Sequence, residues 1–115
     1  MHEASLVTAL FDQVDRSIAP HPGAIVHRVF VRVGELAGVE PELLRLAYDT
    51  LREGRSCASA AIELVSEPAE WQCRACALPI PRGEVLRCPR CEGEARLVRG
   101  GEVFLDRLEL EVPDV

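Results

Sequence analysis

The chain has 115 residues, which is enough for one domain or for one domain with a small satellite, and too few for a large multidomain machine. Thirteen Lys and Arg residues against nineteen Asp and Glu residues give a formal net charge of -6, so nucleic acid is a poor default partner. No apolar stretch approaches the roughly 20 residues that span a bilayer, and the N-terminus lacks the basic and apolar regions of a signal peptide. We therefore expect a soluble, cytoplasmic protein that contacts no membrane.

The first element predicted along the chain is an amphipathic helix over Glu3–Ile18. Its apolar side chains recur at intervals of three and four residues, while Asp, Gln and Arg occupy the opposite arc. The segment APHPG ends the helix, because prolines cannot continue helical hydrogen bonding. The predicted core-facing stripe consists of Leu6, Val7, Leu10, Phe11, Val14 and Ile18.

A strand and a second helix follow. Residues 25–33 alternate with a period of two, which predicts a strand with one buried face. His27 is in phase with that face, where a structural histidine is the ordinary interpretation. The segment GVEPELLRLAYDTLREG then predicts a helix, with Pro41 in the first turn and Gly54 just beyond the end. Its expected apolar stripe contains Leu44, Ala47 and Leu51.

Two further strands are predicted, at residues 60–67 and 106–112. In the latter strand, which ends the chain, Leu108, Leu110 and Val112 alternate with Glu109 and Glu111. Between these strands lies a segment rich in Pro, Gly and Arg, with almost no apolar material for a core of its own. The expected fold is α+β, with a body formed by residues 1–68 and 105–115 and a small inserted domain over residues 69–104.

The inserted segment carries two Cys-x-x-Cys pairs separated by eleven residues. Two residues between cysteines let both sulfurs reach one ion, and two such pairs complete a tetrahedral thiolate shell, which is typical of zinc. Because protein thiolates fill all four positions, the predicted site is structural, and metal binding worth roughly 10 to 16 kcal/mol can fold so small a segment. The ligands are Cys73, Cys76, Cys88 and Cys91, and the cations expected to offset their charge are Arg74, Arg87 and Arg90.

Three other kinds of cysteine site compete with a structural zinc site. A thioredoxin-like pair would need a helix start in a βαβ context, and a rubredoxin-like iron site would use the same ligands as zinc. A zinc ribbon can also act as an adaptor in a protein or nucleic-acid complex, although the acidic balance argues against nucleic acid. Cys57 stands apart and is expected to be a small buried hydrophobe. No Ser/His/Asp set, phosphate loop or open metal site is visible, so we do not expect an enzyme.

The N-terminal tripeptide offers a second candidate metal site. The large side chain of His2 should hinder removal of the initiator, which leaves the free amine on Met1. This amine, the backbone nitrogen of His2 and its imidazole can reach one ion through short chelate rings, and planar nitrogen donors suit Ni(II) or Cu(II). The alternative is a solvated terminal histidine, with Glu3 completing the first helical turn. Neither His21 nor His27 is assigned as a ligand.

The combination of these motifs resembles the HypA family of nickel metallochaperones. MHEASL stands at the start, GELAGVEPELLRLAYD follows a Val-rich strand, and the double Cys-x-x-Cys segment precedes LELEV, all in the family's order and over nearly the whole chain. The resemblance implies delivery of nickel for maturation of [NiFe]-hydrogenase and, in some bacteria, of urease.

For the nickel site, the resemblance implies that His2 is the essential ligand. The Met1 amine and the backbone nitrogens of His2 and Glu3 would complete a planar set, and the Glu3 side chain would support the site. No histidine lies beside the cysteine segment, so a further donor would come from water, a partner or His27.

The resemblance also implies a structural zinc on the four cysteines and a fold of two helices packed on a three-stranded sheet, with the zinc domain inserted before the last strand. The implied partners are the HypB GTPase and the hydrogenase large-subunit precursor. The oligomeric state stays open between a monomer and a weak homodimer.

Overall fold

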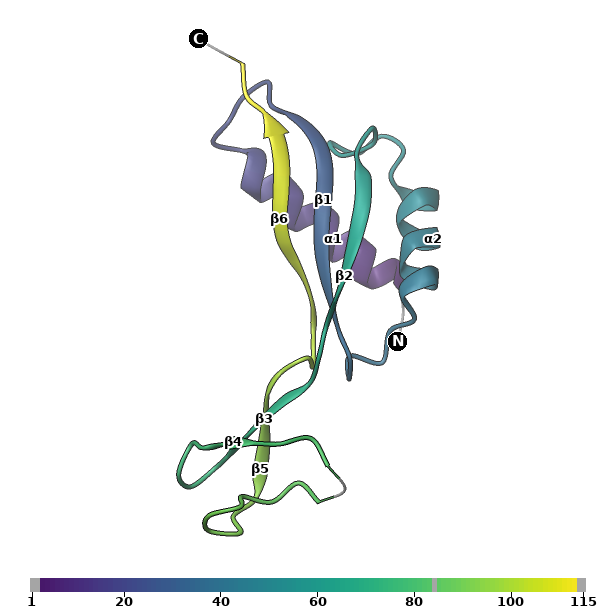
Figure 1. Cartoon of the computed structure of the whole chain (residues 1–115). Coiled ribbons are helices and arrows are strands. Elements are labelled where there is room, and N and C mark those ends of the chain that lie inside the picture. Colours follow the sequence, from purple (N-terminus) through teal and green to yellow (C-terminus); the bar gives the residue numbers. More distant parts are fainter. Residues whose placement is uncertain (1–2, 84, 114–115) are drawn as a thin grey trace.

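The computed structural model describes residues 3–83 and 85–113 and is elongated, with principal extents of 57 × 32 × 17 Å. Figure 1 shows both helices with one sheet at one end and a smaller sheet at the other. The elements of the described residues are α1 (Glu3–Ile18), β1 (Ile25–Gly34), α2 (Pro41–Leu51), β2 (Ala61–Glu67), β3 (Glu70–Cys73), β4 (Pro79–Ile80), β5 (Ala95–Arg99) and β6 (Val103–Glu111).

The larger sheet has the strand order β2-β1-β6, with β1 parallel to β2 and antiparallel to β6. Its two outer strands therefore come from either side of the cysteine segment, which forms the second sheet in the order β4-β3-β5. The α+β prediction is confirmed. The division into domains at residues 68/69 and 104/105 stays a prediction.

The core of the body lies between the helices and one face of the larger sheet. The predicted stripe of α1 is confirmed, because four of its residues are buried and both end residues pack against them. On α2 the prediction was partly wrong: Leu51 is exposed, and Tyr48 is buried beside Leu44. The Tyr48 hydroxyl donates to the carbonyl of Ala60 at 2.9 Å, so this face of the helix carries a satisfied polar group into the core. In the part of the chain that the structure describes, neither helix is long and apolar enough to cross a membrane.

The start of β1 contains a bulge that changes which residues face the core. The pairing with β6 shifts between Val26 and Arg28, so Val26 is buried and Ile25 is half exposed. A shift of one residue moves side chains to the opposite face of a sheet. The interpretation of His27 as a core histidine was therefore wrong: its side chain is 55% exposed, with Nε2 3.9 Å from Glu111 Oε2.

The last strand is longer than predicted. It begins at Val103 and not at residue 106, and it ends at Glu111, so Val112 lies outside it and is exposed. Leu108 and Leu110 pack against the core as predicted. The earlier start brings β6 to the connection between the two sheets.

That connection is held by backbone hydrogen bonds. The amide N–H of Gly34 donates to the carbonyl of Glu102 at 2.9 Å, and the amide N–H of Leu36 donates to the carbonyl of Gly100 at 2.7 Å. Gly100 has a φ of 88°, in the left-handed region, and a Cβ there would lie 2.7 Å from the Cα of Ala69. Backbone thus packs directly on backbone between the two sheets.

An ion pair reinforces the connection from its side. The Arg82 guanidinium, on the loop after β4, donates two hydrogen bonds of 2.6 Å to the two carboxylate oxygens of Glu35. The amide N–H of Ala69 donates to the same carboxylate at 2.9 Å. The Arg82 guanidinium and then the Ala69 amide lower the pKa of the Glu35 carboxyl to about 2. Glu35 therefore joins the body, the connection and the cysteine-bearing sheet.

Candidate metal centre

The structure brings the four predicted cysteines together. The Sγ atoms of Cys73, Cys76, Cys88 and Cys91 all lie within 4.8 Å of one another. Cys73 Sγ is 3.5 Å from Cys91 Sγ, and Cys76 Sγ is 3.5 Å from Cys88 Sγ. Four sulfurs at the usual zinc–sulfur distance of about 2.3 Å lie roughly 3.8 Å apart, so the cluster fits one tetrahedral ion.

The two cysteine pairs adopt the same local structure. The amide N–H two residues after the first cysteine donates to its sulfur at 3.4 Å in both pairs, from Ala75 to Cys73 and from Arg90 to Cys88. Four residues after each first cysteine the chain turns with positive φ, 60° at Ala77 and 58° at Glu92. Two equivalent knuckles therefore present their sulfurs to one point.

Backbone donors favour the thiolate form of both first cysteines. The amide N–H of Cys76 is the largest contribution that lowers the pKa of the Cys73 thiol, to about 6, and the amide of Cys91 acts in the same way on Cys88. At Cys73 and Cys88 the thiolate charge is thus offset by peptide dipoles, whereas neighbouring cysteines raise the pKa of the Cys76 and Cys91 thiols. The guanidinium of Arg87, predicted to serve this purpose, donates to the carbonyl of Glu92 at 3.4 Å.

A small apolar cluster surrounds the sulfurs. Cys73, Ile80 and Cys88 are buried, with three partly buried neighbours: Trp71, Leu78 and Ala95. This cluster is much smaller than the core of the body, so packing alone gives the segment little stability.

Gly93 leaves no room for a side chain beside the cysteines, and we expect Gly93→Ala to weaken metal binding. A Cβ at this position would lie 2.9 Å from Cys73 Sγ and 3.1 Å from Cys91 Sγ. Such crowding typically costs about 1 to 3 kcal/mol, which corresponds to an affinity loss of about 5-fold to 150-fold. Competition with a chromophoric zinc chelator measures it. The control is Gly83→Ala, whose Cβ meets nothing within 4 Å. Equal affinities in both variants would contradict the steric argument.

The second predicted site can be followed only in part. Met1 and His2 lie outside the described residues. Glu3 is half-buried and begins α1, at one end of a groove between the two helices. Since β1 starts near the far end of α1 (Figure 1), His27 does not lie beside Glu3. Whether His27, water or a partner supplies a further nickel donor stays a prediction, because Met1 and His2 lie outside the described residues.

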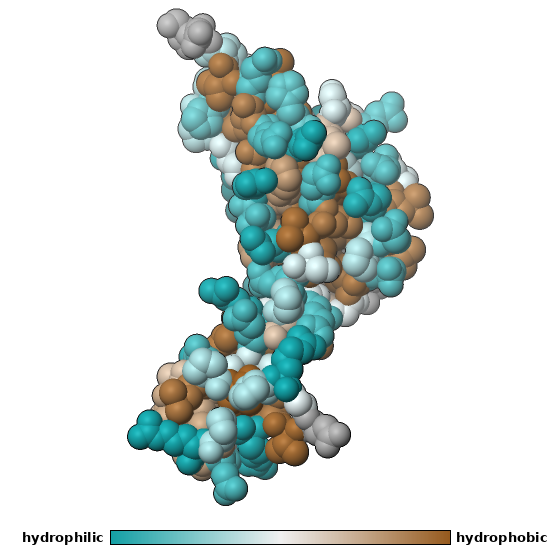
Figure 2. Space-filling view, viewed as in Figure 1, coloured by the Kyte–Doolittle hydropathy of each residue, from teal (hydrophilic) through white to brown (hydrophobic). Residues whose placement is uncertain are grey.

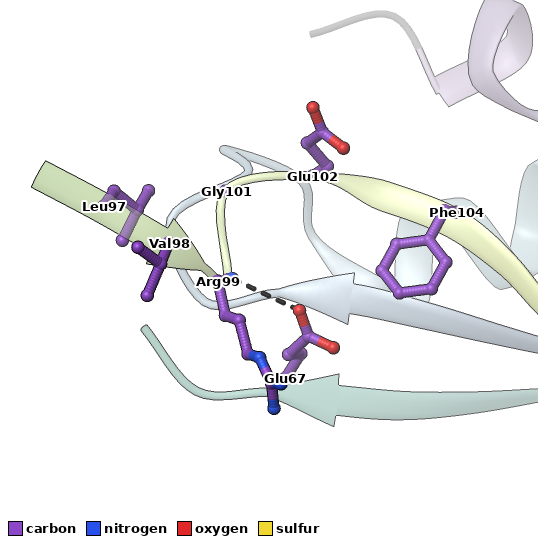
Figure 3. A pocket seen from close by; sticks show the side chains of 8 residues that line it. Glu67, Leu97, Val98, Arg99, Gly101, Glu102 and Phe104 are labelled. Carbon is purple, nitrogen blue, oxygen red and sulfur yellow. Dashed lines mark hydrogen bonds between the residues drawn. The ribbon is translucent and has the colours of Figure 1, made fainter. Parts of the chain in front are cut away.

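A cleft of about 450 Å³ lies beside the connection between the sheets, where β5 turns into β6. Figure 3 shows Glu67 directed at the backbone of the turn, and its Oε1 accepts the amide N–H of Gly100 at 3.3 Å. Glu102, on the same turn, points away from Glu67. The Glu67 carboxylate therefore holds the connection between the sheets in place and does not form a second metal cluster with Glu102.

The sequence did not identify Glu35 and Arg82 as residues that set the position of the metal centre. They are 47 positions apart, and only the observed folding of the loop after β4 brings them into contact. Gly34 and Gly100 do give a signal in the sequence for the close backbone contact between the sheets, since glycine is preferred where backbones approach closely.

Comparisons with known proteins agree with this architecture. A family described as "Hydrogenase/urease nickel incorporation, metallochaperone, hypA" matches residues 1–110. The hydrogenase maturation factor HypA of Shewanella halifaxensis is 34% identical over 113 residues, covering 96% of this chain and 98% of that protein. The corresponding protein of Wolinella succinogenes is also 34% identical, covering 99% of this chain and 98% of its own.

The solution structure of the Ni metallochaperone HypA from Helicobacter pylori superposes with a TM-score of 0.78 at 26% identity, covering 98% of this chain and 100% of that one. These matches run through both sheets, so they do not favour the alternative of a zinc-ribbon adaptor with an inert N-terminus. The chain therefore belongs to the HypA family of hydrogenase/urease nickel-incorporation metallochaperones.

Proposed function

We propose that this chain carries Ni(II) for the maturation of [NiFe]-hydrogenase, with its N-terminal tripeptide as the cargo site and a structural zinc on its four cysteines. The observation that carries the proposal is the family match, which begins at residue 1 and continues through the cysteine segment. Urease, which the family description also names, is a second candidate client.

The proposed nickel donors are the Met1 amine, the His2 imidazole and the backbone nitrogens of His2 and Glu3. Because α1 begins at Glu3, the amide N–H of Glu3 has no acceptor within the helix. Its proton can be replaced by a metal ion without breaking a helical hydrogen bond. The positive end of the helix dipole favours the resulting anionic nitrogen, and the Glu3 carboxylate adds negative charge beside the ion.

Zinc is the proposed resident of the cysteine cluster, which its sulfur spacing supports. Four thiolates leave no open position for water, so this ion would hold structure and perform no hydrolysis. Nickel would be held differently, by terminal nitrogen donors that can be exchanged one at a time. Protonation of His2 at falling pH would favour release.

The proposed setting is the cytoplasm, with no nucleic acid among the partners, in keeping with the net charge of -6. The proposed partners are the HypB GTPase and the hydrogenase large-subunit precursor. Both would exchange nickel with the N-terminus, and neither exchange requires the chain to catalyse a reaction.

Nickel titration of zinc-loaded protein with its native N-terminus tests the proposal. We expect tight 1:1 binding with the absorption bands of a planar nitrogen site. His2→Ala should weaken that binding by on the order of a hundredfold, because it removes a ligand. A short N-terminal extension should act in the same way by displacing the amine. His21→Ala is the control, since His21 is exposed in the turn after α1. Unchanged binding by His2→Ala would overturn the proposal.

A further inference from the structure

The two cysteines of each knuckle differ in their access to solvent. The second cysteines, Cys76 and Cys91, are exposed, whereas the first cysteines, Cys73 and Cys88, are 0% and 1% exposed. The apolar cluster around the sulfurs contains only these two inner cysteines. In the view of Figure 2, the cysteine-bearing sheet projects from the body as a lobe with solvent on either side. A small solute can therefore reach the two outer cysteines directly.

Each outer sulfur lies next to the inner sulfur of the other knuckle. The Sγ atoms of Cys91 and Cys73 are 3.5 Å apart, and those of Cys76 and Cys88 are also 3.5 Å apart. The two outer sulfurs are farther from each other, at 3.9 Å. Because a disulfide bond is about 2 Å long, each sulfur of a 3.5 Å pair would have to move by less than about 1 Å to form one.

Backbone contacts that do not pass through the sulfurs hold the two knuckles side by side. The amide N–H of Arg74 donates to the carbonyl of Glu94 at 2.9 Å, and Cys73 lies opposite Ala95 in the pairing of β3 with β5. The first knuckle is thus joined to the segment that directly follows the second. This arrangement favours bonds between sulfurs of different knuckles.

We propose that the four cysteines also form an oxidation site, which hydrogen peroxide converts into two disulfides across the knuckles. One disulfide joins Cys73 to Cys91, and the other joins Cys76 to Cys88. A sulfur in a disulfide is no longer a thiolate ligand, so oxidation releases the bound metal. The inference goes beyond nickel carriage, and it rests on the proposed function only for the identity of the released ion as zinc.

Each disulfide consumes one molecule of peroxide. A cysteine that binds a metal is already a thiolate, which is the nucleophilic form of the side chain. The Cys91 thiolate attacks one peroxide oxygen, so that an S–O bond forms, the O–O bond breaks and hydroxide leaves. The Cys73 thiolate then attacks the Cys91 sulfur, so that the S–S bond forms, the S–O bond breaks and a second hydroxide leaves. The two sulfurs together lose two electrons to the peroxide, and the other pair reacts in the same way.

The test uses full-length, zinc-loaded Cys57→Ala protein and hydrogen peroxide. Cys57 is fully buried in the core of the body, and its removal leaves only the four cysteines of the cluster. We expect peroxide to release the zinc, measured with a chromophoric chelator against a sample without peroxide. Dithiothreitol should then restore zinc binding, because disulfides are reducible.

Three results of this experiment would overturn the proposal. The first is zinc retention at peroxide concentrations that oxidise free cysteine. The second is a loss of zinc that dithiothreitol does not reverse, because sulfinic acids would then have formed in place of disulfides. The third is release from the parent protein but not from Cys57→Ala, because the buried thiol would then be the oxidised group.

Peptide mapping under non-reducing conditions identifies which sulfurs are joined. Trypsin cuts after arginine, and at least one arginine separates each cysteine of the cluster from the next, at Arg74, Arg82, Arg87 and Arg90. Each of the four cysteines therefore falls on its own peptide, and every pairing gives a different mass. We expect peptide 56–74 linked to 91–96, and peptide 75–82 linked to 88–90. Links within a knuckle, or between the two outer cysteines, would overturn the proposal.

Nickel titration separates this inference from the proposed function. None of the proposed nickel donors is a thiol, so His2→Ala should lose nickel and still form the same two disulfides. If His2→Ala kept its nickel while the disulfides formed, the oxidation site would stand and the terminal nickel site would fall. If the parent protein held no zinc before peroxide was added, the proposed resident ion would be wrong, and the peptide map would still decide the disulfides.

Discussion

Cys88→Ser is expected to release the metal and unfold the cysteine-bearing sheet while the helices of the body remain. Cys88 is buried beside Cys76, and the cluster around them contains few apolar side chains. Metal binding worth roughly 10 to 16 kcal/mol is therefore the main source of order in this segment. Trp71, the only tryptophan, packs against the cluster and should report the change as a red-shifted emission.

The measurements are zinc content by mass spectrometry, Trp71 fluorescence and helical circular dichroism. Cys57→Ala is the matched control, because Cys57 is fully buried in the core of the body and outside the cluster. It should retain zinc and the parent emission. Loss of the whole helical signal in Cys88→Ser would refute the division of the chain into two domains, and full zinc retention would refute the assignment of the ligands.

Gly34→Ala is expected to lower the free energy of unfolding by about 3 kcal/mol or more. A Cβ at this position would lie 2.4 Å from the carbonyl oxygen of Gly100 and 2.8 Å from that of Glu102. The backbone cannot move aside easily, because the amide N–H of Gly34 donates to Glu102. Overpacking costs of 1 to 3 kcal/mol apply where side chains can yield, and here the neighbours are backbone atoms.

Urea unfolding followed by circular dichroism measures this loss. Gly83→Ala serves again as the control, since open space surrounds that position. A Gly34→Ala protein as stable as the control would mean that the two sheets can separate at little cost. The Glu35–Arg82 pair would then not hold them together.

Much of the body could be predicted because its signals are local. The stripe of α1 follows from spacing alone, and the structure buries it as expected. His27 was misplaced because a bulge depends on pairing with a strand about 80 residues away, which periodicity does not detect. Leu51 was misplaced because α2 has two apolar stripes, and only packing against α1 decides which of them enters the core.

At the metal centre, too, some features follow from local spacing in the sequence and others do not. Spacing alone identified the four cysteines, since two Cys-x-x-Cys pairs already specify a tetrahedral set. The short strands around them have too little apolar alternation to be predicted. The roles of Met1 and His2 stay predictions, because those residues lie outside the described part of the chain.

The central place of β1 has a consequence for assembly of the protein. β6 is the last strand along the chain, and it pairs with β1 only after the ends of a long segment, from Glu67 to Val103, have been brought together. When β3 and β5 are already paired, with Glu70 opposite Arg99, only a few residues remain to be closed at each end. By the logarithmic dependence of closure entropy on length, this reduces the cost of closure by about 1.5 kcal/mol. Metal loading of the four cysteines should therefore favour completion of the larger sheet, although none of these cysteines lies in β1, β2 or β6.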